Sequence, residues 1–143
     1  MTAPTLVETR ALTARDVMSC PAIVVSPDNT LWDASRLMMT SGVRHLVVSF
    51  HGRVVGTIDD RAVFAHWPMG PLVLRRTHLA DVVRGRTSCV LAGVELQRVA
   101  ELMMIDASDA VPVVDDVGAV LGIITASDLV AAVACHGISE GTR

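Results

Sequence analysis

Aromatic side chains are scarce in this chain of 143 residues, which has no tyrosine, two phenylalanines and two tryptophans. Proteins that bind single-stranded nucleic acid stack its bases on such side chains. The formal net charge is −3, and the twelve basic residues, all of them arginines, are scattered, so no basic surface for phosphates stands out. The composition therefore argues against a nucleic-acid partner.

Long apolar runs are missing as well. The longest, LVAAVAC at 129–135, is far shorter than the roughly 20 residues that cross a bilayer. The N-terminal segment carries Glu8, Arg10 and Arg15 where a signal peptide would have its apolar core. We therefore expect a cytoplasmic protein with no membrane partner and a flexible N-terminal arm.

Cysteine is rare and unpaired in the sequence. The three cysteines, Cys20, Cys89 and Cys135, are an odd number and show no CxxC spacing. The sequence therefore indicates neither a disulfide framework nor a metal site. Such cysteine usage fits a reducing compartment.

The chain repeats itself. With an offset of 65 residues, DV at 16–17 matches DV at 81–82, and LMM at 37–39 matches LMM at 102–104. Beyond a one-residue gap near His51 the matches continue at an offset of 66. An extra residue inside a strand would turn every later side chain to the wrong face, so the gap indicates a hairpin loop.

Each copy is predicted to fold as β-α-β-β-α. In the first copy the strand is 22–25, the helix 29–42 and the hairpin 45–58, where Gly56 indicates a close backbone approach within a strand. The second copy repeats this order with a strand at 88–91, a helix at 94–107 and a hairpin at 111–124 that contains Gly122.

The repeats also set the predicted domain organisation. One copy alone would leave a sheet face poorly covered, so we expect an α/β (α+β) fold in which two repeats pack as one unit around a pseudo-twofold axis. Pro68 and Pro71 should end the helix that carries Phe64 and Trp67. The expected segments are an arm at 1–12, repeats at 13–67 and 79–136, a packed linker at 68–78 and a tail at 137–143.

The repeated order resembles a known family. The motifs are DVM at 16–18, VSPDNTL at 25–31, GVRHL at 42–46, VPVVDD at 111–116 and GIITASDL at 122–129. Together they resemble a tandem pair of cystathionine-β-synthase (CBS) domains. The resemblance implies a regulatory module that binds an adenine nucleotide (AMP, ADP or ATP) or S-adenosylmethionine between the repeats, requires no cofactor and often forms a homodimer.

The resemblance also implies one complete ligand site. In the motif G-h-h-T-x-x-D, where h is hydrophobic, the Thr contacts phosphate and the Asp contacts the ribose hydroxyls. Thr125 and Asp128 match these positions. The first repeat would complete this predicted site with Ala22, Ile23, Val43, Arg44 and His45.

The second site implied by the resemblance is degenerate. Asp59 replaces the Thr and Ala62 replaces the ribose-binding Asp, while Asp60 and Arg61 offer only substitutes. Two carboxylates near a phosphate are unfavourable, so we predict one competent site per chain. The degenerate site comprises Asp59, Ala62, Ser88, Ser108, Asp109 and Ala110.

Other interpretations of these residues remain open. Thr125 and Asp128 also fit a capping box that starts a helix without any ligand. The chain would then be a ligand-free scaffold that dimerises and contacts other proteins. An enzyme is not indicated, because the sequence has no Walker loop, HExxH or GxSxG motif. Neither the downstream effector protein nor the orientation of a dimer follows from the sequence.

Overall fold

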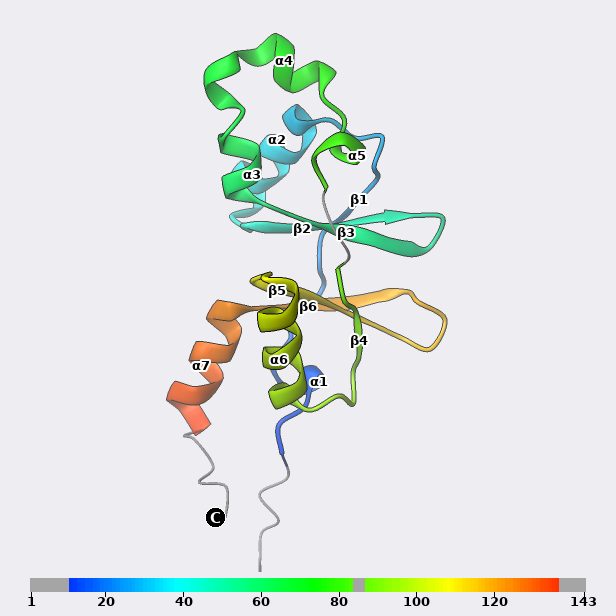
Figure 1. The fold of residues 1–143 in the computed structure, drawn as a ribbon, viewed down its shortest axis with the longest axis vertical. Coiled ribbons are helices and arrows are strands. Elements are labelled where there is room, and N and C mark those ends of the chain that lie inside the picture. Colours follow the sequence, from blue (N-terminus) through cyan, green and yellow to red (C-terminus); the bar gives the residue numbers. More distant parts are fainter. Residues whose placement is uncertain (1–10, 84–86, 137–143) are drawn as a thin grey trace, which may run out of the picture.

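Two three-stranded sheets lie between outer layers of helices (Figure 1). The computed structural model describes residues 11–83 and 87–136. None of the helices in these ranges is both long enough and apolar enough to span a membrane. The elements are α1 (Ala14–Val17), β1 (Val24–Val25), α2 (Leu31–Ser41), β2 (His45–Phe50), β3 (Arg53–Asp59), α3 (Asp60–Phe64), η1 (Trp67–Met69), α4 (Pro71–Arg76), α5 (Leu79–Val82), β4 (Val90–Leu91), α6 (Leu96–Asp106), β5 (Ala110–Val114), β6 (Val120–Thr125) and α7 (Ala126–His136).

The two sheets have the same topology and register. Each pairs a two-residue strand in parallel with the first arm of an antiparallel hairpin, in the orders β1-β2-β3 and β4-β5-β6. Val48 lies opposite Gly56 in one sheet, as Val113 lies opposite Gly122 in the other, and both hairpins have a register shift at this point. The one-residue difference between the repeats therefore falls between these pairs and the hairpin tip, as predicted.

Helices α2 and α6 occupy equivalent positions but start differently. Thr30 caps α2 in a capping box, in which Thr30 N donates to Asp33 Oδ2 at 2.9 Å and Asp33 N donates to Thr30 Oγ1 at 3.2 Å. Glu95 stands at the start of α6 and makes no side-chain cap bond. In both helices one methionine of the LMM motif, Met38 or Met103, is buried in the core of its repeat. The predicted helices are thus confirmed, with their apolar faces inward.

The short helices that open the two repeats pack on the opposite repeat. Helix α1 opens the first repeat, yet Ala14 is fully buried in the core of the second, and its backbone N donates to Val94 O at 2.8 Å. Helix α5 opens the second repeat, yet Leu79 is buried in the core of the first. This exchange means that neither core is complete without a segment from outside its own repeat, so the two repeats form one folding unit.

The sheets face each other across a small apolar layer (Figure 1). Val47 from β2 packs there with Ala110 from β5 and Ile123 from β6. Gly122 allows the Ser19 segment to pack closely on β6, because a Cβ atom at that position would lie 2.7 Å from the carbonyl oxygen of Ser19. Gly56 is crowded by the Val83 side chain instead. The predicted close backbone approach is thus confirmed at Gly122, whereas a side chain takes that place at Gly56.

The segment between the repeats differs in detail from the prediction. The helix expected to carry both Phe64 and Trp67 ends at Phe64, and Trp67 begins the separate 3-10 helix η1. Pro68 explains the break, since it lacks the N–H group that would bond the Phe64 carbonyl in a continuous α-helix. The linker then forms α4, whose Leu74 is buried in the first core.

Candidate functional site

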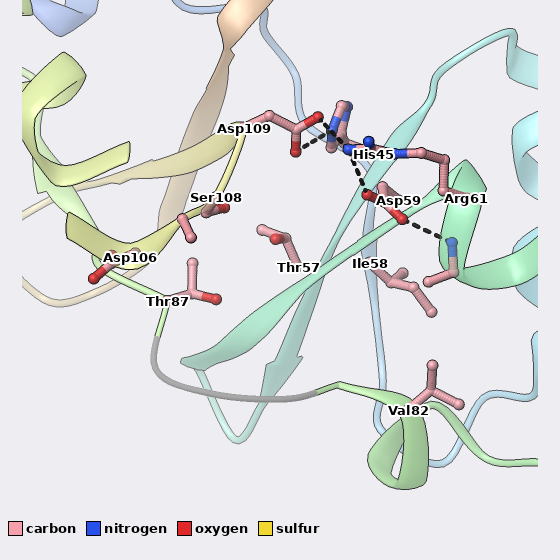
Figure 2. A pocket seen from close by; sticks show the side chains of 12 residues that line it. His45, Thr57, Ile58, Asp59, Arg61, Val82, Thr87, Asp106, Ser108 and Asp109 are labelled. Carbon is pink, nitrogen blue, oxygen red and sulfur yellow. Dashed lines mark hydrogen bonds and ion pairs between the residues drawn. The ribbon is translucent and has the colours of Figure 1, made fainter. Parts of the chain in front are cut away.

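A pocket of about 670 Å³ lies between the two repeats, and we call it the His45 pocket (Figure 2). Its first wall is formed by β2, β3 and the start of α3, and its second wall by the segment that joins α6 to β5. The polar side chains that line it are those of His45, Thr57, Asp59, Arg61, Thr87, Asp106, Ser108 and Asp109.

Four of these side chains form a network across the pocket. His45 Nε2 lies 3.1 Å from Asp109 Oδ1, and Arg61 Nη2 donates to Asp109 Oδ2 at 3.2 Å and to Asp59 Oδ2 at 3.4 Å. Asp109 belongs to the second repeat, whereas the other three belong to the first. The network therefore links the repeats through charged groups (Figure 2).

Secondary structure fixes two members of the network. His45 and Asp59 are direct partners at the end of the β2-β3 ladder. Asp59 also caps α3, because its Oδ1 accepts from Ala62 N at 2.8 Å. One oxygen of this carboxylate thus starts the helix, and the other faces the pocket. The His45 side chain is only 14% exposed and that of Asp59 24%, whereas that of Arg61 is 77% exposed.

The structure brings together most residues of the predicted degenerate site. Asp59, Ala62, Ser108 and Asp109 all line the His45 pocket. Two residues assigned to the same site do not line it. Ser88 donates from its backbone N to Asp106 Oδ2 at 3.3 Å, and Ala110 is buried in the layer between the sheets.

The family resemblance assigns His45 to the same site as Thr125 and Asp128, but in the structure its ring lies elsewhere. Its ring lies in the His45 pocket against Asp109. His45 begins β2, whereas the adjacent Arg44 lies in a bend just before that strand. Arg44 is exposed and is not part of the pocket lining.

Thr125 and Asp128 form a helix-capping arrangement at the start of α7. Thr125 donates to Asp128 Oδ2 from its backbone N at 2.8 Å and from Oγ1 at 3.1 Å. From the residues that the structure describes, the other carboxylate oxygen, Oδ1, receives only a long hydrogen bond of 3.4 Å from Ser19 Oγ. Ser19 reaches this place because its backbone pairs with Ile123 on β6. This set of residues is the Asp128 site.

The other residues predicted for the Asp128 site lie in the first repeat. Ala22 packs against the apolar layer between the sheets, while Ile23 and Val43 pack against the first core. Arg44 makes no ion pair with another residue in the described ranges. No hydrogen bond within the described part of the chain joins these four residues to Thr125 or Asp128.

Sequence reasoning missed three polar residues of the His45 pocket, namely Thr57, Thr87 and Asp106. Thr57 lies two residues before Asp59 on β3, and alternation along a strand places both on one face. That signal was present in the sequence. Thr87 and Asp106 carry no such signal, because they reach the pocket from loop and helix ends of the other repeat.

Comparisons with known proteins agree with this architecture. The family model described as "CBS domain" matches residues 14–67 and 79–135. The crystal structure of the CBS domain pair of protein MJ0100, in complex with 5-methylthioadenosine and S-adenosyl-L-methionine, superposes with a TM-score of 0.74 at 21% identity, covering 87% of this chain and 98% of that one. The crystal structure of CBSX2 in complex with AMP gives 0.68 at 25% identity, covering 86% and 96%.

Two curated relatives, both from Methanocaldococcus jannaschii, match in sequence. Inosine-5'-monophosphate dehydrogenase is 32% identical over 117 residues, and the uncharacterized protein MJ1225 is 28% identical over 124 residues. About 80% of this chain is matched in each case, but the chain spans only 22% and 44% of those proteins. With two family matches that cover most of its length, the chain belongs to the CBS domain family.

Proposed function

We propose that this protein is a non-catalytic regulatory module that binds one adenine nucleotide or adenosyl compound per chain at the Asp128 site. Binding there would join Ser19 and Arg44 of the first repeat to α7 of the second. The ligand would thereby change the packing of the repeats, and an effector protein or the protein's own assembly would respond. Family membership supports the ligand class, as do the related structures that hold S-adenosyl-L-methionine, 5-methylthioadenosine and AMP.

The observation that carries the proposal is that the two oxygens of the Asp128 carboxylate differ in their hydrogen bonds. Oδ2 accepts two hydrogen bonds from Thr125, which fix the position of the side chain. Within the described ranges Oδ1 has one hydrogen bond, of 3.4 Å, which is beyond the usual range for an O–H···O bond. A carboxylate only accepts hydrogen bonds, so Oδ1 is suited to the vicinal hydroxyls of a ribose.

Two further groups favour an anionic ligand. Helix α7 begins at Ala126, so the positive end of its dipole lies beside Thr125. Arg44 is an exposed guanidinium without a carboxylate partner among the described residues, and it offers a planar pair of donors to phosphate oxygens.

The His45 pocket does not supply an equivalent second site. Its Asp59 and Asp109 carboxylates share a single cation, Arg61, so the three side chains together keep a net negative charge where a phosphate would lie. Ala62 stands at the position that corresponds to Asp128 and has no oxygen for a ribose. We therefore infer a stoichiometry of one ligand per chain.

Calorimetric titration with ATP, AMP and S-adenosylmethionine tests the proposal. Asp128→Ala should weaken binding by roughly 100-fold, since each hydrogen bond to a charged group is worth about 1.5–3 kcal/mol. Because Asp128 also caps α7, the matched control is Asp33→Ala, which removes the acid of the corresponding capping box in α2. The control should lose similar stability and keep full affinity. Equal loss of affinity in both variants, or two ligands per wild-type chain, would contradict the proposal.

A second candidate function is that of a dimeric interaction scaffold. Large apolar side chains are exposed on α6 and α7, among them Ile105 at 70% and Val130 at 69%. Exposed apolar surface of this kind is typical of a protein interface. In a homodimer the same surface of a second chain would pack against it. If sedimentation shows a dimer that Ile105→Glu dissociates, and no adenosyl compound raises the melting temperature, the scaffold is the better description.

A further inference from the structure

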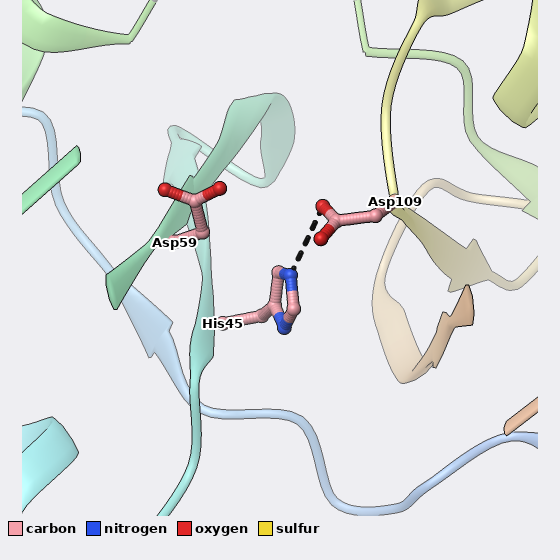
Figure 3. Close-up of side chains that lie close together, drawn as sticks. All are labelled: His45, Asp59 and Asp109. Atoms are coloured by element: carbon pink, nitrogen blue, oxygen red, sulfur yellow. Dashed lines mark hydrogen bonds and ion pairs between the residues drawn. The ribbon is translucent and has the colours of Figure 1, made fainter. Parts of the chain in front are cut away.

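His45, Asp59 and Asp109 form a cluster of potential metal ligands between the repeats (Figure 3). One ligand atom from each residue can be chosen so that all three lie within 4.8 Å of one another. The cluster combines one imidazole nitrogen with two carboxylate oxygens. It also joins β2 and β3 of the first repeat to the segment just before β5 of the second.

The backbone holds the cluster in place before any ion binds. His45 and Asp59 are neighbours across the β2-β3 ladder, so their Cα positions are fixed by the sheet. The bond from Ala62 N to Asp59 Oδ1 orients that carboxylate and leaves Oδ2 toward the pocket. Asp109 is less constrained, because its side chain is 41% exposed, and it is the ligand that can move.

The charge of the cluster also favours a cation. Two carboxylates lie at one edge of the pocket, and Arg61 is the described cation that contacts both. Its contacts are long, 3.2 and 3.4 Å, and its side chain is largely exposed. Arg61 therefore neutralises the carboxylates from the solvent side and can swing away when a smaller, doubly charged ion takes its place.

We propose that His45, Asp59 and Asp109 bind one divalent first-row transition-metal ion of the Zn²⁺ class, which bridges the two repeats. An imidazole with two carboxylates suits such an ion better than Mg²⁺ or Ca²⁺, which prefer oxygen ligands alone. Bonds of about 2.0–2.2 Å require ligand atoms roughly 3.3 Å apart, so the cluster contracts modestly on binding. The hydrogen bond between His45 Nε2 and Asp109 Oδ1 is then replaced by two bonds to the metal, and water completes the coordination.

This site is separate from the Asp128 site and needs no nucleotide. None of its three ligands contacts Thr125 or Asp128 through a hydrogen bond in the described ranges. Metal binding can therefore be measured with ZnCl₂ and nucleotide-free protein, and its failure would leave the proposed regulatory function untouched.

The experiment is calorimetric titration of the full chain with Zn²⁺, with Mg²⁺ as the comparison ion. We expect one Zn²⁺ per chain and no comparable binding of Mg²⁺. His45→Ala should weaken Zn²⁺ binding at least tenfold, and Asp109→Asn, which keeps the side-chain shape, serves the same purpose if His45→Ala does not fold. Arg61→Ala should strengthen binding, because it removes the competing cation.

A matched histidine controls for binding elsewhere. His51 lies exposed in the first hairpin turn at a φ of 49°, a conformation that Asn tolerates, so His51→Asn should fold and keep full Zn²⁺ affinity. The three cysteines are unchanged in every variant, so any binding by them cancels in the comparison. Zn²⁺ binding that persists in both His45→Ala and Asp109→Asn would overturn the proposal, as would a folded wild-type protein that binds no Zn²⁺.

Discussion

The Asp128 site and the His45 pocket occupy corresponding places in two repeats of the same sheet topology, yet their side chains carry different charges. Thr125 corresponds to Asp59 and Asp128 to Ala62, while the exposed cation Arg44 corresponds to Asp109. The proposed nucleotide site combines a hydroxyl, a single anchored carboxylate and the exposed Arg44 guanidinium. The His45 pocket holds two carboxylates, an imidazole and the exposed Arg61 guanidinium. The backbone of the fold thus fixes where a ligand can bind, and a few side chains decide its charge.

Rebuilding the His45 pocket on the pattern of the Asp128 site should have the largest effect on this comparison. The triple variant Asp59→Thr, Ala62→Asp and Asp109→Arg removes both carboxylates that oppose a phosphate and adds one for the ribose. We expect the nucleotide stoichiometry to rise from one to two per chain and Zn²⁺ binding to disappear. Ala62→Asp alone keeps the acidic pair and should stay at one. A triple variant that folds but still binds a single nucleotide would show that the backbone of the two sites also differs.

The two strand glycines provide the next largest contrast. Gly122→Ala would place its Cβ 2.7 Å from a backbone oxygen, Ser19 O, whereas Gly56→Ala meets the Val83 side chain. A side chain can rotate away and a paired backbone cannot. We expect Gly122→Ala to cost about 1–3 kcal/mol in urea denaturation and Gly56→Ala distinctly less. An equal cost at both positions would show that the Ser19 segment moves freely.

The duplicated fold was predictable from the sequence because its signals are local and occur twice. The capped apolar stripe at 29–42, the glycine turn near His51 and the offset between the copies, 65 residues before that turn and 66 after it, define the same elements independently. The exchange of α1 and α5 was not predictable. DV at 16–17 and DV at 81–82 are identical in sequence. The local sequence does not indicate whether each segment packs on its own repeat or on the other one.

The position of His45 shows why the candidate site was harder to predict than the fold. Counting back from the hairpin tip, where Phe50 pairs with Arg53, would place His45 opposite Ile58. The register shift between Val48 and Ser49 moves it opposite Asp59 instead. Bulges of this kind re-aim side chains without a clear sequence signature. The pairing of His45 with Asp109 further depends on how the two repeats dock, which no local pattern encodes.

Helix starts give a smaller and cleaner contrast between the repeats. Thr30→Ala removes the cap of α2 and should cost about 1 kcal/mol, whereas Glu95→Ser adds a cap that α6 lacks and should stabilise the protein by roughly 0.5–1 kcal/mol. Glu95 already has the extended backbone of an N-cap residue, with φ −68° and ψ 147°. Chemical denaturation measures both changes. Destabilisation by Glu95→Ser would mean that the glutamate side chain has a role beyond the helix start.

The smallest expected effect is the pH dependence of the capping box in α2. The hydrogen bond from the Thr30 backbone N is the main cause that lowers the pKa of Asp33 below 3.8, its ordinary value. A carboxyl whose pKa is lower in the folded than in the unfolded state stabilises the fold above the unfolded pKa, and this contribution is lost as the pH falls through the folded pKa. Asp33→Asn should therefore lower the free energy of unfolding at pH 7, and the difference from wild type should shrink below pH 3.8. The measurement is urea denaturation of both proteins from neutral to acidic pH. If the difference in unfolding free energy stays constant over this range, the negative charge of Asp33 does not contribute to the stability of α2.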